Sequence, residues 1–423
     1  LGVMAEEVNV WGRFRALPRP VFAIRPLQRM LYATRASLLR SEPIHPPNPR
    51  IQPMGTEKRV NYWDYIRVDE LLSLQGGVEH DESDLHNDEV MFIVVHQVYE
   101  LWFKLMLREL KAARDLFEGG PVEEQALSGA VHCLRRVCTV LDRCVDHFTI
   151  METLSTRDYL SFRDKLMPAS GFQSGQLREV ELILGLQDED RIPLGVEGDY
   201  MQALRSHDGK TSPTYERVEA TRASGQSIRE VIEEWLYRTP IDGVGPDDEG
   251  SEEKLDQFVD RYLGAVNAEI DDSCAVALSR SRSDQDKQTL VARYEKEKAG
   301  QEAFLHPSEE EGGGRRRRIR MAILFITTYR ELPLLAWPRE LVDQLVELEQ
   351  KFVIFRQRHA RMVERVIGRR VGTGGSAGVD YLDKTALEYR VFRDLWAVRT
   401  LLLRREAAPH LGEAAFYGFS AEE

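Results

Sequence analysis

The chain has 423 residues, of which 42% are hydrophobic and 30% are charged, so it can form one large domain or two medium ones with a substantial core. Its formal net charge of −13 argues against a nucleic-acid partner. Four scattered cysteines without a CxxC pair argue against a disulfide scaffold and a structural zinc site, and no uninterrupted apolar run approaches the roughly 20 residues of a membrane span. We therefore expect a soluble, cytoplasmic enzyme with no membrane partner.

Residues 1–55 differ in composition from the rest of the chain. They hold eight of the 18 prolines and eight arginines against three glutamates. This balance is typical of an organelle-targeting arm, but the prolines would interrupt the amphipathic helix that targeting needs. The alternatives are a disordered arm or residues upstream of a later start such as Met54. We predict a disordered arm over 1–55, a single domain over 56–410 and a tail over 411–423.

Between residues 61 and 187 the apolar residues recur with a helical period, and no segment alternates as a strand would. The first helix is expected to close at Gly76-Gly77, before an acidic loop over 79–89. Ser155 or Thr156 would cap a later short helix, and a turn over 168–171 follows that helix. The predicted helices cover residues 63–75, 89–117, 122–150, 156–166 and 173–186.

The segment 188–315 is polar and variable in character. Helices are predicted there over 226–237, 252–270 and 285–303. Its end carries three glutamates, three glycines and four arginines over 309–318, which we interpret as a mobile solvated loop, with a regulatory or partner-binding loop as the alternative.

The last third returns to a helical period. A helix begins near Pro338, carries an apolar stripe and ends at Gly368, and a glycine-rich loop over 372–378 follows it. A final helix is predicted over 382–404. The fold class is therefore all-α, with long helices packed as a bundle.

Two histidines lie on apolar faces of separate predicted helices. His359 lies between Phe355 and Met362, and His96 lies between Phe92 and Tyr99. Either residue alone could be a satisfied core histidine. Two of them in one bundle suit a haem site, with an axial imidazole on one helix and a lined cavity on another. The HExxH motif of zinc enzymes and the paired ExxH motifs of di-iron bundles are absent.

Two further features could bind a zwitterion. Arg178 lies near the start of an apolar helix, where it could clamp a carboxylate or form a surface ion pair with Glu179 or Glu181. The loop over 372–378 lacks the phosphate-loop pattern, but Thr373 and the backbone could form a lid over a ligand. The alternative for the loop is a simple flexible connection.

Taken together, five segments resemble those of the tryptophan 2,3-dioxygenase family. They are YWDYI at 62–66, FIVVHQVYELWFK at 92–104, ASGFQS at 169–174 followed by Arg178, RHARMVERVIG at 358–368, and GTGGSAG at 372–378. The resemblance covers about 60–405 and is weakest over 190–315. It implies an all-helical bundle that binds haem b, active as Fe²⁺, in a homotetramer. It also implies cleavage of the indole C2–C3 bond of L-tryptophan by O₂ to give N-formyl-L-kynurenine, the first step of the kynurenine pathway.

The resemblance also implies roles for individual residues. His359 matches the axial haem ligand, and His96 matches the catalytic-site histidine that hydrogen-bonds the indole N–H. Phe92 matches the aromatic wall beside the indole, and Arg178 matches the partner of the substrate carboxylate. In the glycine-rich loop, Thr373 would hold the substrate's ammonium and carboxylate groups, and Gly374 and Ser376 would lie against the cofactor. Three residues would reach the pocket of a neighbouring subunit: Tyr62, Tyr65 and Ile66.

Two positions depart from the family pattern. Gly175 and Leu177 lie beside Arg178, where the family tends to carry a larger apolar residue and an aromatic one. We expect this change to loosen the wall near the substrate. It motivates a second hypothesis, a related haem enzyme that oxidises a substituted indole or tryptophan derivative and inserts one oxygen atom instead of two. A third hypothesis is a haem-binding sensor bundle, against which the intact Arg178 and Thr373 argue.

Overall fold

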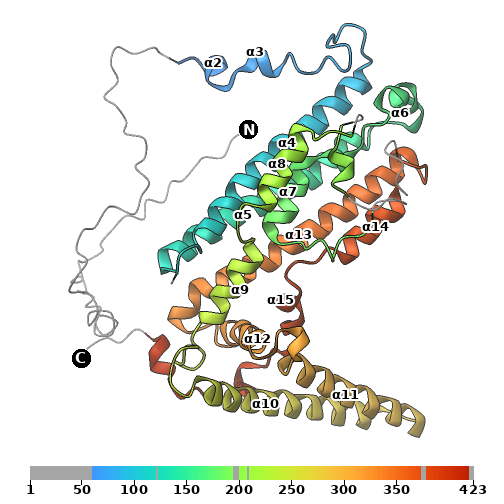
Figure 1. The fold of residues 1–423 in the computed structure, drawn as a ribbon. Coiled ribbons are helices and arrows are strands. Elements are labelled where there is room, and N and C mark those ends of the chain that lie inside the picture. Colours follow the sequence, from blue (N-terminus) through green and yellow to red (C-terminus); the bar gives the residue numbers. More distant parts are fainter. Residues whose placement is uncertain (1–59, 121, 194–199, 207–208, 373–377, 419–423) are drawn as a thin grey trace, which may run out of the picture. The chain divides into compact units, whose positions relative to one another are not determined.

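The computed structural model describes residues 60–120, 122–193, 200–206, 209–372 and 378–418 (Figure 1). By its internal contacts the chain divides into one unit of Leu1–Lys58 with Gly418–Glu423 and another of Arg59–Tyr417. The fold described below is that of the second unit. The arm expected over 1–55 lies outside the described residues.

Within the described residues every regular element is a helix, and the sole β feature is an isolated bridge between Ile241 and Val244. The all-α prediction is therefore confirmed. Three long helices form the centre of the bundle, and α5 packs against both of the others (Figure 1). They are α4 (Asn87–Asp115), α5 (Glu124–Met151) and α13 (Ala336–Ile367).

Aromatic rings join these three helices. Tyr99 of α4 lies 5.2 Å from Phe148 of α5 and 6.3 Å from Phe355 of α13, measured between ring centroids. Phe103, one turn further along α4, also contacts Phe355. Burial of such rings is the main stabilising contribution of a helical bundle, and their edge-to-face contacts add to it.

Helix α4 is the single helix of the described chain that is long and apolar enough to cross a membrane, judged by length and composition. The core helix of a soluble protein passes the same test, because one side of it must be apolar throughout. In this fold Val95, Met106 and Leu110 of α4 are buried in the core of the bundle. In all, 28% of the apolar window of α4 is buried inside the structure, and one such helix is weak evidence for a membrane span.

Shorter helices cover the bundle. The α7 helix packs on α4, α8 packs on α7, and α14 packs on α13. Their ends follow local sequence signals: Ser155 caps α6 as predicted, Ser174 caps α7, and Gly185 ends α7 with a φ of 108°. Their bounds are α6 Thr156–Phe162, α7 Gly175–Leu184, α8 Pro213–Arg222 and α14 Val379–Glu388.

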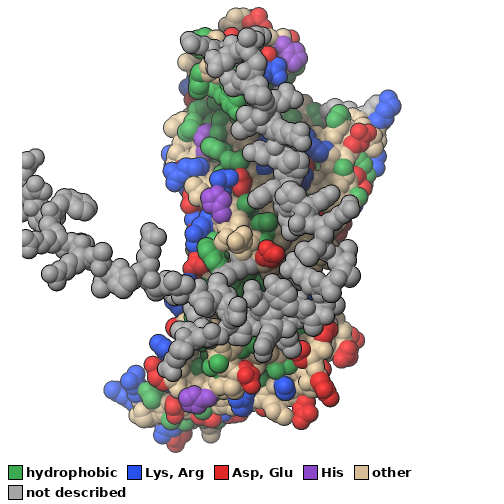
Figure 2. Space-filling view, turned by 90° about the vertical axis from the view of Figure 1, so that its left-hand side faces the viewer, with side chains coloured by type: hydrophobic (Ala, Val, Ile, Leu, Met, Phe, Trp, Pro, Cys, Tyr) green, Lys and Arg blue, Asp and Glu red, His purple; other side chains and the backbone are tan. Residues whose placement is uncertain are grey.

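A second group of helices lies beside the far ends of α5 and α13 (Figure 1). The α10 and α11 helices pair along their length, and α12 packs on both α9 and α13. Their bounds are α9 Ile228–Arg238, α10 Ser251–Arg280, α11 Asp284–Leu305, α12 Gly313–Thr328 and α15 Arg393–Ala397. On the face shown in Figure 2 the acidic and basic side chains are intermixed.

The structure corrects the interpretation of the arginine-rich tract as a solvated loop. The four arginines begin helix α12, and Arg318 is 1% exposed. Its guanidinium donates to the carbonyl oxygens of Tyr237 and Val244 and to the hydroxyl of Ser251, at 3.0, 2.8 and 3.1 Å. A buried guanidinium with three acceptors fixes this segment in place, because an unpaired one would be costly.

Other helices also differ from the prediction. Helix α10 continues to Arg280, where an end at residue 270 was expected. The first helix is split into α2 (Tyr62–Ile66) and α3 (Val68–Leu71), because Arg67 adopts a left-handed conformation. Helix α8 was missed. The final predicted helix is broken between α14 and α15, where the backbone N–H groups of Val391 and Phe392 donate to the carboxylate of Glu349 at 2.5 and 2.9 Å. The buried Glu349 carboxylate accepts from these two N–H groups, which a continuous helix would have paired with its own backbone carbonyl oxygens.

Candidate active site

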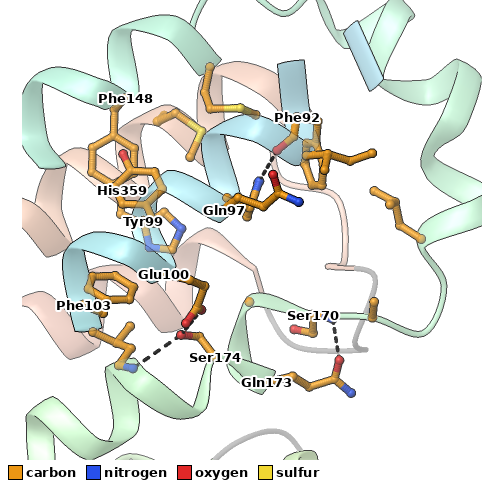
Figure 3. Close-up of a pocket in the computed structure, with 18 of the residues that line it drawn as sticks. Phe92, Gln97, Tyr99, Glu100, Phe103, Phe148, Ser170, Gln173, Ser174 and His359 are labelled. Carbon is orange, nitrogen blue, oxygen red and sulfur yellow. Dashed lines mark hydrogen bonds between the residues drawn. The ribbon is translucent and has the colours of Figure 1, made fainter. Parts of the chain in front are cut away.

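A cavity of about 500 Å³ lies among α4, α5, α13 and the 166–177 segment (Figure 3). Its lining is mainly aromatic and aliphatic, with His96 on one helix and His359 on another. This volume is in the range of cofactor and small-molecule sites. The lining includes Phe92, Tyr99, Glu100, Phe103, Phe148, Met151, Tyr159, Leu177, Phe355 and Met362.

His96 lies on α4 with one nitrogen already used. Its Nδ1 lies 2.7 Å from the carbonyl oxygen of Phe92, one turn earlier. A carbonyl oxygen can only accept, so Nδ1 carries the proton and Nε2 keeps a lone pair. Burial lowers the pKa of His96, which favours this neutral form. The side chain therefore offers a single hydrogen-bond acceptor to the cavity, beside the Phe92 ring at 4.1 Å.

His359 lies on α13 and faces the same cavity. Its ring stacks on Phe148 at 5.6 Å, with 8° between the planes (Figure 3). Burial lowers its pKa to about 4, and the nearby positive charges of Arg356 and Arg178 act in the same direction. A neutral imidazole is the form that binds a metal ion. Its ring makes no hydrogen bond to a protein atom of the described chain, so a nitrogen is available for a ligand.

Arg178 lies in a second, smaller cavity of about 170 Å³ that also reaches His359. The two cavities share Tyr159, Leu177 and Phe355 among their lining residues. Arg178 is 6% exposed, and its Nη1 donates to Glu181 at 2.7 Å. The structure thus gives Arg178 one of the two expected ion-pair partners, but in the interior and not at the surface.

The 169–176 segment is tied to α4 by Glu100. Ser174 donates its hydroxyl to the Glu100 carboxylate at 2.6 Å (Figure 3). The side chain of Gln176 donates to the carboxylate and to the carbonyl oxygen of Glu100, at 2.7 Å each. Ser170 and Gln173 form a reciprocal cap within the same segment. These bonds fix the wall of the cavity between His96 and Arg178.

The two departures from the family pattern prove unequal. A side chain at Gly175 would meet Cγ2 of Thr214 at 2.3 Å, because Gly175 faces α8 and does not line either cavity. The expectation that Gly175 loosens the substrate wall is therefore wrong. Leu177 does line both cavities, so its smaller side chain does leave more room there than an aromatic residue would.

The remaining site residues of the sequence analysis are not gathered at this cavity. Tyr62, Tyr65 and Ile66 on α2 are 72%, 80% and 42% exposed. The loop residues Thr373, Gly374 and Ser376 lie outside the described residues. No group of three metal-ligating side chains occurs in the part of the chain that the structure describes.

Sequence reasoning considered Glu181 only as a surface partner of Arg178, and it missed Arg191 and Arg356. Glu181 is 1% exposed and also accepts from Arg191 and Arg356, at 2.7 and 2.9 Å. The spacing of three between Arg178 and Glu181 was visible in the sequence, and it places both side chains on one helix face. The other two arginines come from distant positions that no local pattern connects to α7.

Known proteins are similar to this chain over most of its length. A family model described as tryptophan 2,3-dioxygenase matches residues 52–402. A protein named tryptophan 2,3-dioxygenase from Sorangium cellulosum is 51% identical over 418 residues, covering 98% of this chain and 97% of that protein. One named tryptophan 2,3-dioxygenase 2 from Ralstonia nicotianae is 50% identical over 370 residues (86% and 99%). One named tryptophan 2,3-dioxygenase from Anopheles gambiae is 32% identical over 365 residues (85% and 89%).

Proposed function

The chain belongs to the tryptophan 2,3-dioxygenase family, and we propose that it opens the indole ring of L-tryptophan between C2 and C3 with O₂ to give N-formyl-L-kynurenine. The observation that carries the proposal is the apolar cavity of about 500 Å³ lined by both His96 and His359. It offers one neutral acceptor for an indole N–H and one neutral imidazole for an iron ion, on opposite helices of the bundle.

The residues present suit haem b. The cavity is apolar and aromatic, and His359 is neutral with a nitrogen that no described protein atom occupies. His359 would hold the iron, while Phe148 fixes the orientation of the imidazole ring by stacking. When bound in its ferrous state, haem supplies the activation of O₂. Gly374 and Ser376 are proposed to lie against it.

The chain's own residues would orient the substrate. Nε2 of His96 accepts the indole N–H, and Phe92 lies against the indole face, supported by Tyr159 and Phe162 at 6.1 and 5.7 Å. Arg178 pairs with the carboxylate, and Thr373 completes the zwitterion site. Holding both ends of the substrate sets C2 and C3 in one place and removes the entropy cost of finding it.

We further propose that the enzyme is a homotetramer in the cytoplasm. Tyr62, Tyr65 and Ile66 expose large apolar surface, and covering them with the pocket of a neighbouring subunit would remove that surface from water. The chain that follows this segment is held near the cavity, because Gln97, which lines the cavity, donates to the carbonyl oxygen of Leu74 at 2.8 Å. All four cysteines are free, which suits a reducing compartment.

A related haem enzyme acting on a substituted indole remains a second candidate, and Leu177 is the observation that favours it. Its side chain lines both cavities where the family tends to carry an aromatic residue. A substituted indole would use the space that the missing ring leaves.

The test is turnover by the haem-loaded full chain. The protein is reduced without oxygen, L-tryptophan is added, O₂ is admitted, and the product is followed by absorbance and mass. A product two oxygen atoms heavier than tryptophan supports the proposal. A product one oxygen atom heavier, or turnover only of ring-substituted tryptophans, favours the second candidate. Haem that does not bind after haem-supplemented expression would exclude both.

A further inference from the structure

Behind Arg178 lies a buried ionic cluster that the proposed catalytic residues do not account for. At its centre is Glu181 of α7, which accepts hydrogen bonds from Arg178, Arg191 and Arg356 at 2.7, 2.7 and 2.9 Å. These arginines come from α7, from the segment after α7, and from α13. One carboxylate therefore joins three parts of the chain at the edge of the substrate site.

The cluster has more positive than negative charge. Three guanidiniums surround one buried carboxylate. Among the described residues, the half-exposed Asp188 is the other acid within ion-pair distance, 3.3 Å from Arg191, and the buried Glu349 lines a small cavity beside Arg356. Burial opposes ionisation of Glu181, but Arg178, Arg356 and Arg191 outweigh it and hold the pKa of this carboxyl well below its usual range. Glu181 is thus ionised throughout the physiological pH range, and positive charge is left over beside the cavity.

The surplus charge faces the smaller cavity. Arg178 and Arg356 both line it, together with His359. The Nε atoms of Arg178 and Arg356 are buried and have no hydrogen-bond partner in the structure. Arg356 is held from the other side by the Tyr389 ring, 4.8 Å away. The cluster therefore holds the guanidiniums of Arg178 and Arg356 in place at the smaller cavity, where their positive charge can attract a ligand.

We propose that Glu181 is a positioning residue: it fixes Arg178 and Arg356 in the geometry that selects a ligand carrying a carboxylate. The inference rests on the proposed function, because the ligand is taken to be an amino acid whose carboxylate meets Arg178. Glu181 touches neither substrate nor cofactor and acts through the guanidinium it orients. Three methylene groups join the guanidinium of Arg178 to its backbone, and without Glu181 the guanidinium would be free to move toward water.

Two effects of removing Glu181 oppose each other, so the sign of the result is informative. Loss of the negative charge raises the positive potential at Arg178, which by itself would strengthen carboxylate binding. Loss of the anchor lets the guanidinium leave its position, which weakens binding. Breaking a buried charge pair usually costs more than the charge change returns, so orientation should dominate.

Glu179 provides a matched control on the same helix. It is 2% exposed and accepts from Arg217 at 2.5 Å and Thr221 at 3.0 Å, both on α8. The Glu179→Gln and Glu181→Gln variants therefore make the same chemical change at nearly equal burial, at two positions of α7 that have one residue between them. Only the second variant removes a partner of Arg178.

The experiment compares kcat/KM for L-tryptophan with that for L-tryptophanamide, whose neutral amide replaces the carboxylate, in the haem-loaded full chain. Glu181→Gln should lower the preference for the carboxylate compound about 30-fold, mostly through KM, with Glu179→Gln within about 2-fold of the parent. If Glu181→Gln fails to fold, Glu181→Asp keeps the charge and should show a smaller loss of the same preference.

Three results would overturn the inference. A Glu181→Gln variant with the parent's preference, or with a stronger one, would show that Glu181 does not orient Arg178. An equal loss in Glu179→Gln would show a structural role for buried carboxylates of α7 in general. Parent protein that turned over neither compound would overturn the proposed function and this inference with it, and that result is read from the parent alone.

Discussion

The role of His96 can be tested by removing either partner of one hydrogen bond. The structure leaves Nε2 as the single acceptor of this ring, because Nδ1 is committed to the carbonyl oxygen of Phe92 at 2.7 Å. His96→Ala removes the acceptor, and 1-methyl-L-tryptophan removes the donor. If the indole N–H meets Nε2, the two changes should not be additive.

The expected magnitude follows from the environment of the ring. A neutral hydrogen bond contributes about 0.5–1.5 kcal/mol. The His96 side chain is exposed toward the cavity, and a bound indole would cover it, so that an acceptor then left unpaired would cost about 1–3 kcal/mol. Methylation of the substrate should therefore lower kcat/KM of the parent about 10- to 100-fold, since about 1.4 kcal/mol corresponds to a factor of ten. In His96→Ala the acceptor is absent and the methyl group has space, so methylation should cost about 3-fold or less.

The assay is steady-state turnover of both substrates by both proteins at saturating O₂, with haem content measured for each. The quantity of interest is the ratio of the two methylation effects. Equal effects of methylation in parent and variant would refute the hydrogen bond between His96 and the indole N–H. A haem content that fell in His96→Ala would instead indicate that this residue supports the cofactor.

The remaining predictions concern ligation, pH and stability. His359→Ala should reduce haem content to about a tenth or less, since it removes the nitrogen proposed to hold the iron, and a variant that kept full haem absorbance would refute the ligand assignment. Burial lowers the pKa of His359 to about 4, against about 6.5 in the unfolded chain. The contribution of the neutral His359 imidazole to the stability of the haem-free protein is therefore fully present above about pH 6.5 and is lost as the pH falls toward 4. Urea unfolding at several pH values would measure this loss. Arg318→Met should lower the free energy of unfolding by about 3 kcal/mol, because it removes three hydrogen bonds worth about 1 kcal/mol each; an unchanged urea midpoint would contradict this. Gly175→Leu should lower the thermal midpoint without changing the choice between indole substrates, since its side chain would meet Thr214 and not the cavity.

The helical period of the sequence predicted the centre of the fold well. The α4, α5 and α13 helices begin and end within about two residues of their expected bounds. Long amphipathic helices carry a strong local signal, and Gly368 marks the end of α13. The same signal placed His96 and His359 on apolar faces, which the structure brings to one cavity.

The failures share a physical cause. The run Arg315–Arg318 looks solvated in sequence because each side chain is charged. In the fold each arginine finds a different partner: Glu234, Asp394, Glu252 and, for Arg318, neutral oxygens in the interior. Such partners lie far away in the sequence, so no local rule can separate a solvated charge run from a buried anchor.

The break in the final helix has the same origin. Residues 382–404 carry a helical pattern, but Glu349, more than 40 positions away, binds the backbone N–H groups of Val391 and Phe392. A buried carboxylate must be satisfied, and it takes two donors that a continuous helix would have kept. The sequence predicted Glu181 as a possible partner of Arg178 but not the cluster around it, because Arg191 and Arg356 meet Glu181 only in the folded chain.

The most direct test of the central claim uses ¹⁸O₂ as the only oxygen source for the haem-loaded parent and L-tryptophan. If the cavity between His96 and His359 holds the indole for addition of both atoms of one O₂ molecule, the product should carry two labelled oxygen atoms before any exchange with water. A product with one labelled atom would contradict dioxygenase chemistry at this site, and an unchanged substrate mass would contradict the assignment of the cavity.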